Sequence, residues 1–162
     1  MISITLQTKN SMCFLLRGRK KIKTAREDII VFKMISKSGC SFYYNLVIKK
    51  KVEKWTPGYI YMETTPFKSM ERVSFVDGRD GICVEGDAFH SRATLEGAMN
   101  MVYSLHTQKV VVMVIPKGSL YLKNETEYVS SSLYYVKQTK KIREAIEEGD
   151  EEKVKELVKG GK

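Results

Sequence analysis

The stretch TLEGAMNMVYSLHTQKVVVMVI, residues 94–115, contains the two clearest structural signals in the chain. Thr94 is a typical helix N-cap, and Glu96 follows it in the first turn. Apolar side chains then recur at three- and four-residue spacing, which predicts an amphipathic helix over residues 94–108; they are Leu95, Ala98, Met99, Val102 and Leu105. Val110–Ile115 is apolar at every position, as is typical of a strand that is buried on both faces. The stretch therefore predicts a helix followed by a central strand of a sheet.

Shorter strand signals lie on both sides of this unit. Segments rich in β-branched and apolar residues predict strands; they are residues 2–7, Met12–Leu16, Ile29–Ile35, Phe42–Ile48, Tyr59–Glu63, Val73–Val76, Leu120–Leu122 and Leu133–Val136. Residues 77–87 hold three glycines and four acidic residues, which indicates a loop or a hairpin. Because strands outnumber helices, we expect an α+β fold in which one main helix packs on a mostly antiparallel sheet.

The C-terminal residues differ in composition from the rest of the chain. Residues 140–148 and 151–159 are predicted to form two short helices, separated by Gly149-Asp150. This pair resembles the helices of one ankyrin repeat, and a single repeat cannot bury its own apolar face. The pair must then pack on the body of the protein, on another subunit or on a partner that binds residues 139–159. We divide the chain into an α+β core domain, residues 1–137, and a C-terminal helical hairpin, residues 138–162.

The overall composition is that of an ordinary globular domain. Hydrophobic residues make up 43% of the chain and charged residues 29%, and no apolar run approaches the roughly 20 residues of a membrane span. The N-terminus has no signal-peptide layout. Cys13, Cys40 and Cys83 do not combine with His90 or His106 at the spacing of zinc ligands. We therefore expect a cytoplasmic protein with no membrane association, no metal and no cofactor.

The net charge of +9 is concentrated in the first third of the chain. Residues 1–55 hold thirteen Lys and Arg side chains against three acidic ones, a net charge of +10. Two clusters account for this excess, and the second ends in an aromatic residue; their members are Arg17, Arg19, Lys20, Lys21, Lys23 and Arg26, and Lys49, Lys50, Lys51, Lys54 and Trp55. Such clusters neutralise phosphates and release counterions, and a neighbouring aromatic ring can stack on an unpaired base. The alternative is a solvated basic loop whose aromatic neighbours lie in the core.

One layout in the second half of the chain resembles a known group of proteins. Phe89-His90-Ser91 is followed by the predicted helix, the apolar strand and Pro116-Lys117-Gly118-Ser119. This order is similar to that of small uncharacterised proteins of bacteriophages and their Bacteroidetes-type hosts. The similarity covers roughly residues 12–137. It implies a phage or mobile-element setting, in which small basic proteins often antagonise host defence systems.

A second resemblance is to ADP-ribosyltransferases. It rests on a Phe/Ser-containing strand before a helix and a Glu near the last strands; here Ser91 stands for the family's serine, and Glu125 or Glu127 for its catalytic glutamate. His90, beside Ser91, would carry a proton near neutral pH. The arginine or histidine of the family's first strand is not evident, because Lys33 is the only cation in Ile29–Ile35. The alternative is that Glu125 and Glu127 are solvent-facing hairpin residues.

Two functions follow from these features. The first is a non-enzymatic basic binding protein that engages nucleic acid or a nucleic-acid–protein complex, such as a CRISPR effector of the host. The second is an ADP-ribosyltransferase-like enzyme with a site near His90, Ser91 and Glu127. If the first function is correct, charge reversal in the basic clusters should abolish binding. If the second is correct, substitution of His90 should lower the rate of the enzymatic reaction about 100-fold.

Overall fold

The computed structural model describes residues 14–18, 21–40, 54–84 and 87–161. The strands predicted at residues 2–7 and Phe42–Ile48 lie outside these ranges. The described residues form eleven strands: β1 Phe14–Arg17, β2 Lys23–Thr24, β3 Ile29–Ser36, β4 Ile60–Met62, β5 Met70–Ser74, β6 Asp80–Val84, β7 Phe89–Arg92, β8 Gln108–Ile115, β9 Leu120–Lys123, β10 Glu127–Ser130 and β11 Ser132–Tyr135. They also form three helices: α1 Leu95–Met99, α2 Lys140–Glu147 and α3 Glu151–Gly160.

Eight of the strands form one sheet, in the order β2-β9-β10-β7-β3-β8-β11-β4. Every pair of neighbours in it is antiparallel. The longest pairing joins β3 to β8, from Ile29↔Ile115 to Ser36↔Gln108. Residues Val111–Ile115 of β8 are all buried, so the prediction of a strand covered on both faces is confirmed. The expected α+β class with a mostly antiparallel sheet is confirmed as well.

One face of this sheet encloses the largest apolar cluster of the described residues. Val31 and Ile35 from β3 meet Met113 from β8 and Leu133 from β11 in this cluster. Tyr61 of β4 and Tyr121 of β9 pack against the same cluster, although their strands lie near opposite ends of the sheet order. The sheet must therefore curl around this inner face, as antiparallel sheets with strong twist do.

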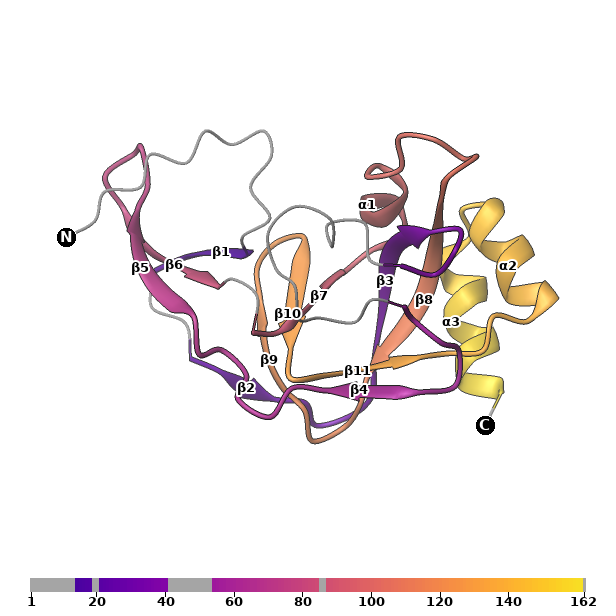
Figure 1. Ribbon diagram of the computed structural model, residues 1–162, viewed down its shortest axis with the longest axis horizontal. Coiled ribbons are helices and arrows are strands. Elements are labelled where there is room, and N and C mark those ends of the chain that lie inside the picture. The colour runs from indigo at the N-terminus through magenta and orange to yellow at the C-terminus, as the bar shows by residue number, and fades with distance from the viewer. Residues whose placement is uncertain (1–13, 19–20, 41–53, 85–86, 162) are drawn as a thin grey trace.

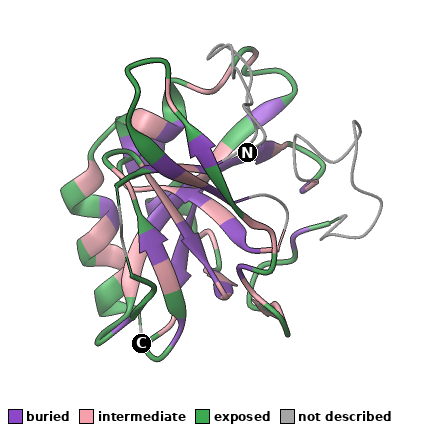
Figure 2. Ribbon diagram, turned by 90° about the vertical axis from the view of Figure 1, so that its left-hand side faces the viewer, coloured by how far each residue is buried: buried purple, intermediate pink, exposed green. Residues whose placement is uncertain are grey.

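The three helices cover the other, outer face of β3 and β8 (Figure 1). Phe32 and Val112 project from the two strands into a second apolar cluster, where they meet Leu95 of α1, Ile142 of α2 and Val154 of α3. The side of α2 and α3 that faces away from the sheet is mostly exposed (Figure 2). The apolar face of the C-terminal helix pair is thus buried against the body of the protein. None of the helices among the described residues has the length and apolar character needed to cross a membrane.

The remaining three strands form a small antiparallel sheet in the order β1-β6-β5. Residues 70–84 are thus a β5–β6 hairpin, which settles the loop-or-hairpin alternative in favour of the hairpin. Phe14 and Leu16 of β1 pack on Leu122 of β9 and Val129 of β10 in a third apolar cluster. This small sheet therefore lies against the β9–β10 end of the large one.

The predicted helix over residues 94–108 is much shorter in the structure. Thr94 is its N-cap as expected, but α1 ends at Met99 and strand β8 already begins at Gln108. The side-chain oxygen Oε1 of Gln108 accepts hydrogen bonds from the backbone N–H groups of Tyr103 and Ser104, which stabilises a turn in place of further helix. Leu105 is 76% exposed, so the C-terminal half of the apolar pattern does not form a buried face.

Candidate nucleic-acid interface

Three cations of the first basic cluster lie together on the outside of the protein. Lys21, Lys23 and Arg26 are all exposed, and none of them has an ion-pair partner within the described part of the chain. Lys23 belongs to β2, which is the last strand at one end of the large sheet. Lysines are common on such edge strands because they prevent pairing with another chain. The same side chains present positive charge to solvent, and no described carboxylate forms an ion pair with them.

Backbone hydrogen bonds attach this segment to the turn between β8 and β9. The N–H of Ala25 donates to the carbonyl of Ser119 at 2.8 Å, and the N–H of Gly118 donates to the carbonyl of Ala25 at 2.9 Å. The N–H of Lys117 donates to Oδ1 of Asp28 at 2.8 Å. These bonds bring Lys117 close to Arg26, so the turn adds a further exposed cation to the segment.

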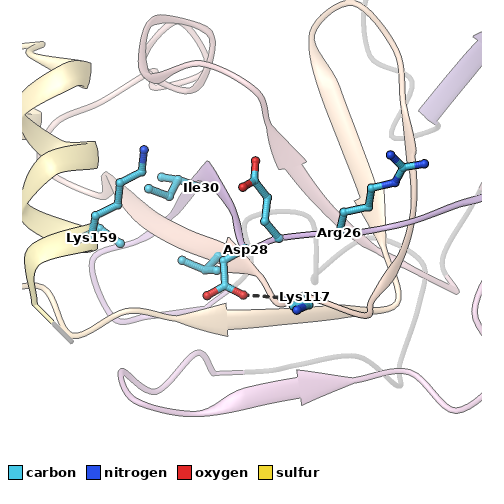
Figure 3. A pocket seen from close by; sticks show the side chains of 8 residues that line it. Arg26, Asp28, Ile30, Lys117 and Lys159 are labelled. Atoms are coloured by element: carbon cyan, nitrogen blue, oxygen red, sulfur yellow. Dashed lines mark hydrogen bonds between the residues drawn. The ribbon is translucent and has the colours of Figure 1, made fainter.

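A surface hollow of about 400 Å³ lies beside Arg26 (Figure 3). Arg26 and Lys159 stand on opposite sides of it, and Ile30 and Asp28 lie between them. Val114 and Val158 complete an apolar floor. Three cations and two carboxylates, those of Glu27 and Asp28, line the hollow, which leaves a net positive charge around an apolar base. An anionic ligand with an apolar part fits such a surface.

The other residues of the first cluster do not join this surface directly. Arg17 is at the end of β1 in the small sheet, where its Nη1 donates to Oδ2 of Asp77 at 2.6 Å. Its guanidinium also lies 4.9 Å from the ring centroid of Phe75. This ion pair partly neutralises Arg17. Arg19 and Lys20 lie outside the described residues.

The second basic cluster lies elsewhere in the fold, as far as the structure describes it. Lys54 is exposed beside the turn that follows β3, since the N–H of Trp55 donates to the carbonyl of Gly39 at 2.7 Å. Arg26 precedes β3, so the two cations are separated by the length of an eight-residue strand, about 25 Å. Lys49, Lys50 and Lys51 lie outside the described residues.

The predicted stacking role of Trp55 does not agree with its position. Trp55 is 3% exposed and belongs to the inner apolar cluster. Its ring centroid lies 4.6 Å from that of Tyr61 and 5.9 Å from that of Phe89, both in edge-on geometry. The ring is therefore not available to an incoming base, and the alternative that placed the aromatic residue in the core is correct for Trp55.

A cluster of charged residues lies where β3 and β7 separate. The two strands pair at a single position, Phe32↔Arg92, so they diverge on the side of Lys33 and His90. The Nζ of Lys33 donates to the backbone carbonyl of His90 at 2.5 Å and lies 5.6 Å from the ring centroid of Trp55. On the neighbouring pair of strands, Nη2 of Arg92 and Oε1 of Glu127 form an ion pair at 3.0 Å.

The environment shifts the pKa values of this cluster in opposite directions. Burial lowers the pKa of Lys33 from 10.5 to about 8; Glu127 opposes this shift and the positive charge of Arg92 adds to it. Burial also raises the pKa of Glu127, against the attraction of Arg92 and Lys33. Desolvation disfavours the charged form of each group, which explains both directions.

The structure brings His90, Ser91 and Glu127 onto the paired strands β7 and β10 but does not make their side chains converge. Tyr128 pairs with Ser91 and Val129 with His90. Because side chains alternate along a strand, His90 and Ser91 project to opposite faces of the sheet. Glu127 is half-buried and paired with Arg92, so the alternative of a solvent-facing residue is wrong for it, whereas Glu125 is exposed.

Three cations that matter in this geometry were not among the predicted binding residues. Lys117 and Lys159 line the same hollow as Arg26 only because the turn after β8 and helix α3 lie beside the same segment. A sequence signal did exist for Lys33, since it is the one charged residue in the apolar strand Ile29–Ile35. A cation at such a position needs a polar partner inside the fold.

Comparisons with known proteins returned no match: no protein-family model, no curated protein and no solved structure matches the chain. Within the described ranges, no group of three or more His, Cys, Asp and Glu side chains is placed to hold a metal ion.

Proposed function

We propose that this protein is a non-enzymatic, basic binding protein that engages nucleic acid, alone or within a nucleic-acid–protein complex. One observation carries the proposal: Lys21, Lys23 and Arg26 are exposed, have no ion-pair partner among the described residues and are attached by backbone hydrogen bonds to the turn that bears Lys117. Exposed cations that are not held in ion pairs, on a hydrogen-bonded scaffold, attract phosphates. Their contribution is independent of base sequence.

The contact surface starts at β2 and extends towards the hollow beside Arg26. The phosphate chain runs along Lys21 and Lys23 and reaches Arg26 and Lys117, while the apolar floor at Ile30 accepts the face of a sugar or an unpaired base. Arg17 contributes less, because Asp77 already neutralises it. A net charge of +9 adds a long-range attraction that speeds the encounter.

The setting of this activity follows from the resemblance to small phage and Bacteroidetes-type proteins. In that setting the nucleic acid belongs to a host defence effector, and occupation of the effector's nucleic-acid site would inhibit it. The class of target is thus a ribonucleoprotein such as a CRISPR effector. This part of the proposal rests on the sequence layout and the surface charge together.

The direct test is binding of a labelled single-stranded RNA and a labelled DNA duplex, measured by fluorescence anisotropy. The variant Lys21→Glu/Lys23→Glu/Arg26→Glu should lose binding at least 100-fold, because three phosphate contacts become repulsive. The matched control, Lys140→Glu/Lys141→Glu/Arg143→Glu, changes the net charge by the same amount on α2 and should retain most of the affinity. Equal losses in the two variants would show that only the total charge matters and would refute the proposed surface.

An ADP-ribosyltransferase-like enzyme is the second candidate. Its support is that Glu127 is half-buried, has a raised pKa and lies opposite Arg92 on the strand next to Ser91. The opposite orientation of His90 and Ser91 argues against joint action of those two residues. Consumption of NAD⁺ that Glu127→Gln abolishes would support this candidate, and absence of consumption by the unaltered protein would exclude it.

A further inference from the structure

Counted over the described residues, the charged cluster at the divergence of β3 and β7 carries more positive than negative charge. Lys33 and Arg92 are cations, and Glu127 is the one carboxylate among the described residues that affects the pKa of Lys33. All three residues are half-buried. A charge that is withdrawn from water requires a compensating partner. Within the described ranges, the one carboxylate, already paired with Arg92 at 3.0 Å, does not balance the two cations.

A second and independent observation concerns Ser91. Its hydroxyl is buried, the residue is 4% exposed, and Oγ has no hydrogen-bond partner among the residues that the structure describes. Buried hydroxyl groups nearly always have a partner, so the Ser91 hydroxyl is able to donate a hydrogen bond to a bound group. Ser91 shares the inner face of the sheet with Phe89, and Lys33 shares it with Val31 and Ile35. An ammonium and an unpartnered hydroxyl thus lie on the same face of strands that separate from one another.

We propose that Lys33 and Ser91 form a binding site for a small oxyanion, the phosphate group of a small molecule. The ammonium of Lys33 pairs with one oxygen of the anion, and the hydroxyl of Ser91 donates to another. Arg92 adds attraction across the sheet without contacting the anion. The site does not depend on the exposed cations Lys21, Lys23 and Arg26, which lie on a different part of the protein.

The chain supplies its own reporter for this site. It contains one tryptophan, Trp55, and the ring centroid of Trp55 lies 5.6 Å from Nζ of Lys33. An anion that draws the ammonium away from the ring changes the environment of the indole. Because Trp55 is the one tryptophan of the chain, a change in tryptophan fluorescence reports a change beside Lys33.

The experiment is a titration of the full chain with inorganic phosphate at pH 7, against sodium chloride at matched ionic strength. We expect a saturable change in Trp55 emission with phosphate and none with chloride. Lys33→Met should abolish the change, whereas Lys37→Met, an exposed lysine just beyond the end of β3, should leave it intact. Equal responses to phosphate and chloride, or an unchanged response in Lys33→Met, would overturn the proposal.

A milder variant keeps the test valid if Lys33→Met perturbs the fold. Ser91→Ala removes only a hydroxyl and should weaken phosphate binding about 5- to 10-fold. A phosphate affinity equal to that of the unaltered protein would remove Ser91 from the site. The variant Lys21→Glu/Lys23→Glu/Arg26→Glu should respond to phosphate normally, so failure of this site and failure of the nucleic-acid surface are distinguishable.

Discussion

Replacement of Lys33 by Met should change how the stability of the protein depends on pH. The folded pKa of Lys33 is about 8, against an ordinary value of 10.5. Between these two values the unfolded chain binds more protons than the folded one, so the free energy of unfolding rises as the pH rises. Lys33 therefore costs stability at pH 7, and the cost decreases above pH 8. Met has a similar length and no charge, so the variant lacks this dependence.

The size of the effect follows from the difference between the two pKa values. At pH 7 both states are protonated, and the shift corresponds to a cost of about 3.5 kcal/mol. At pH 9.5 the folded state is already neutral and the cost is about 1.5 kcal/mol. The unaltered protein should thus gain about 2 kcal/mol relative to Lys33→Met between pH 7 and pH 9.5.

The assay is urea denaturation of both proteins at pH 7, 8, 9 and 9.5, followed by Trp55 fluorescence or circular dichroism. The series stops at pH 9.5 because burial raises the pKa of Tyr135; the unfolded chain then loses that proton first, and stability falls above about pH 10. Lys37→Met is the matched control, since Lys37 is exposed. It should follow the unaltered protein at every pH. If the free energy of unfolding of Lys33→Met and that of the unaltered protein change with pH in the same way, the lowered pKa of Lys33 is refuted.

Three further substitutions test other parts of the structure, each by urea denaturation. Glu127→Gln should cost about 1–3 kcal/mol through loss of a half-buried ion pair; it should also lower the pH at which Trp55 fluorescence reports deprotonation of Lys33, because Glu127 raises that pKa. Gln138→Ala should lower the free energy of unfolding by about 1–3 kcal/mol. The Gln138 side-chain amide hydrogen-bonds both the N–H and the carbonyl of Val112, which lies beyond the last residue of β8 that pairs with β11. Gly81→Ala should cost about 2–3 kcal/mol, because a Cβ there collides with the Phe75 ring and the carbonyl oxygen of Leu16.

Each of these substitutions has an outcome that contradicts the reasoning. If Glu127→Gln leaves the midpoint of the pH titration of Trp55 fluorescence unchanged, Glu127 does not raise the pKa of Lys33. Gln138→Ala at full stability would mean that Val112 finds other partners. Gly81→Ala at full stability would show that β1 and β6 can move apart.

The strands were the most predictable part of the fold. β3 and β8 each have a run of β-branched and apolar residues, and such runs indicate burial on both faces whatever the topology. The two C-terminal helices were predictable for a similar reason, because Thr139 and Asp150 cap them and their apolar residues follow helical spacing. Local signals and tertiary structure agree at these elements.

The helix after Thr94 shows where local signals fail. Its apolar pattern continues to Leu105, but the chain must reach Gln108 in time to pair with Ser36 at the end of β3. Tertiary pairing therefore ends the helix at Met99, with the Gln108 side chain stabilising the turn. Periodicity carries no information on where a neighbouring strand has to start.

The candidate sites were only partly predictable. The basic clusters are visible in the sequence, but their separation by the length of β3 depends on the fold. Burial of Trp55 depends on Tyr61 and Phe89, which its position beside Lys54 does not reveal. The neighbourhood of Lys33 and Ser91 likewise depends on the antiparallel register of β3 and β7, which brings together residues more than fifty positions apart.

The most direct test of the proposed nucleic-acid surface is the salt dependence of RNA binding. The logarithm of the affinity falls linearly with the logarithm of the salt concentration, with a slope of about −0.7 for each phosphate contact to a single strand. The unaltered protein should bind with a steep slope, and Lys21→Ala/Lys23→Ala/Arg26→Ala should reduce the slope by about 2. Identical slopes, or no binding by the unaltered protein at the lowest salt concentration, would contradict the account.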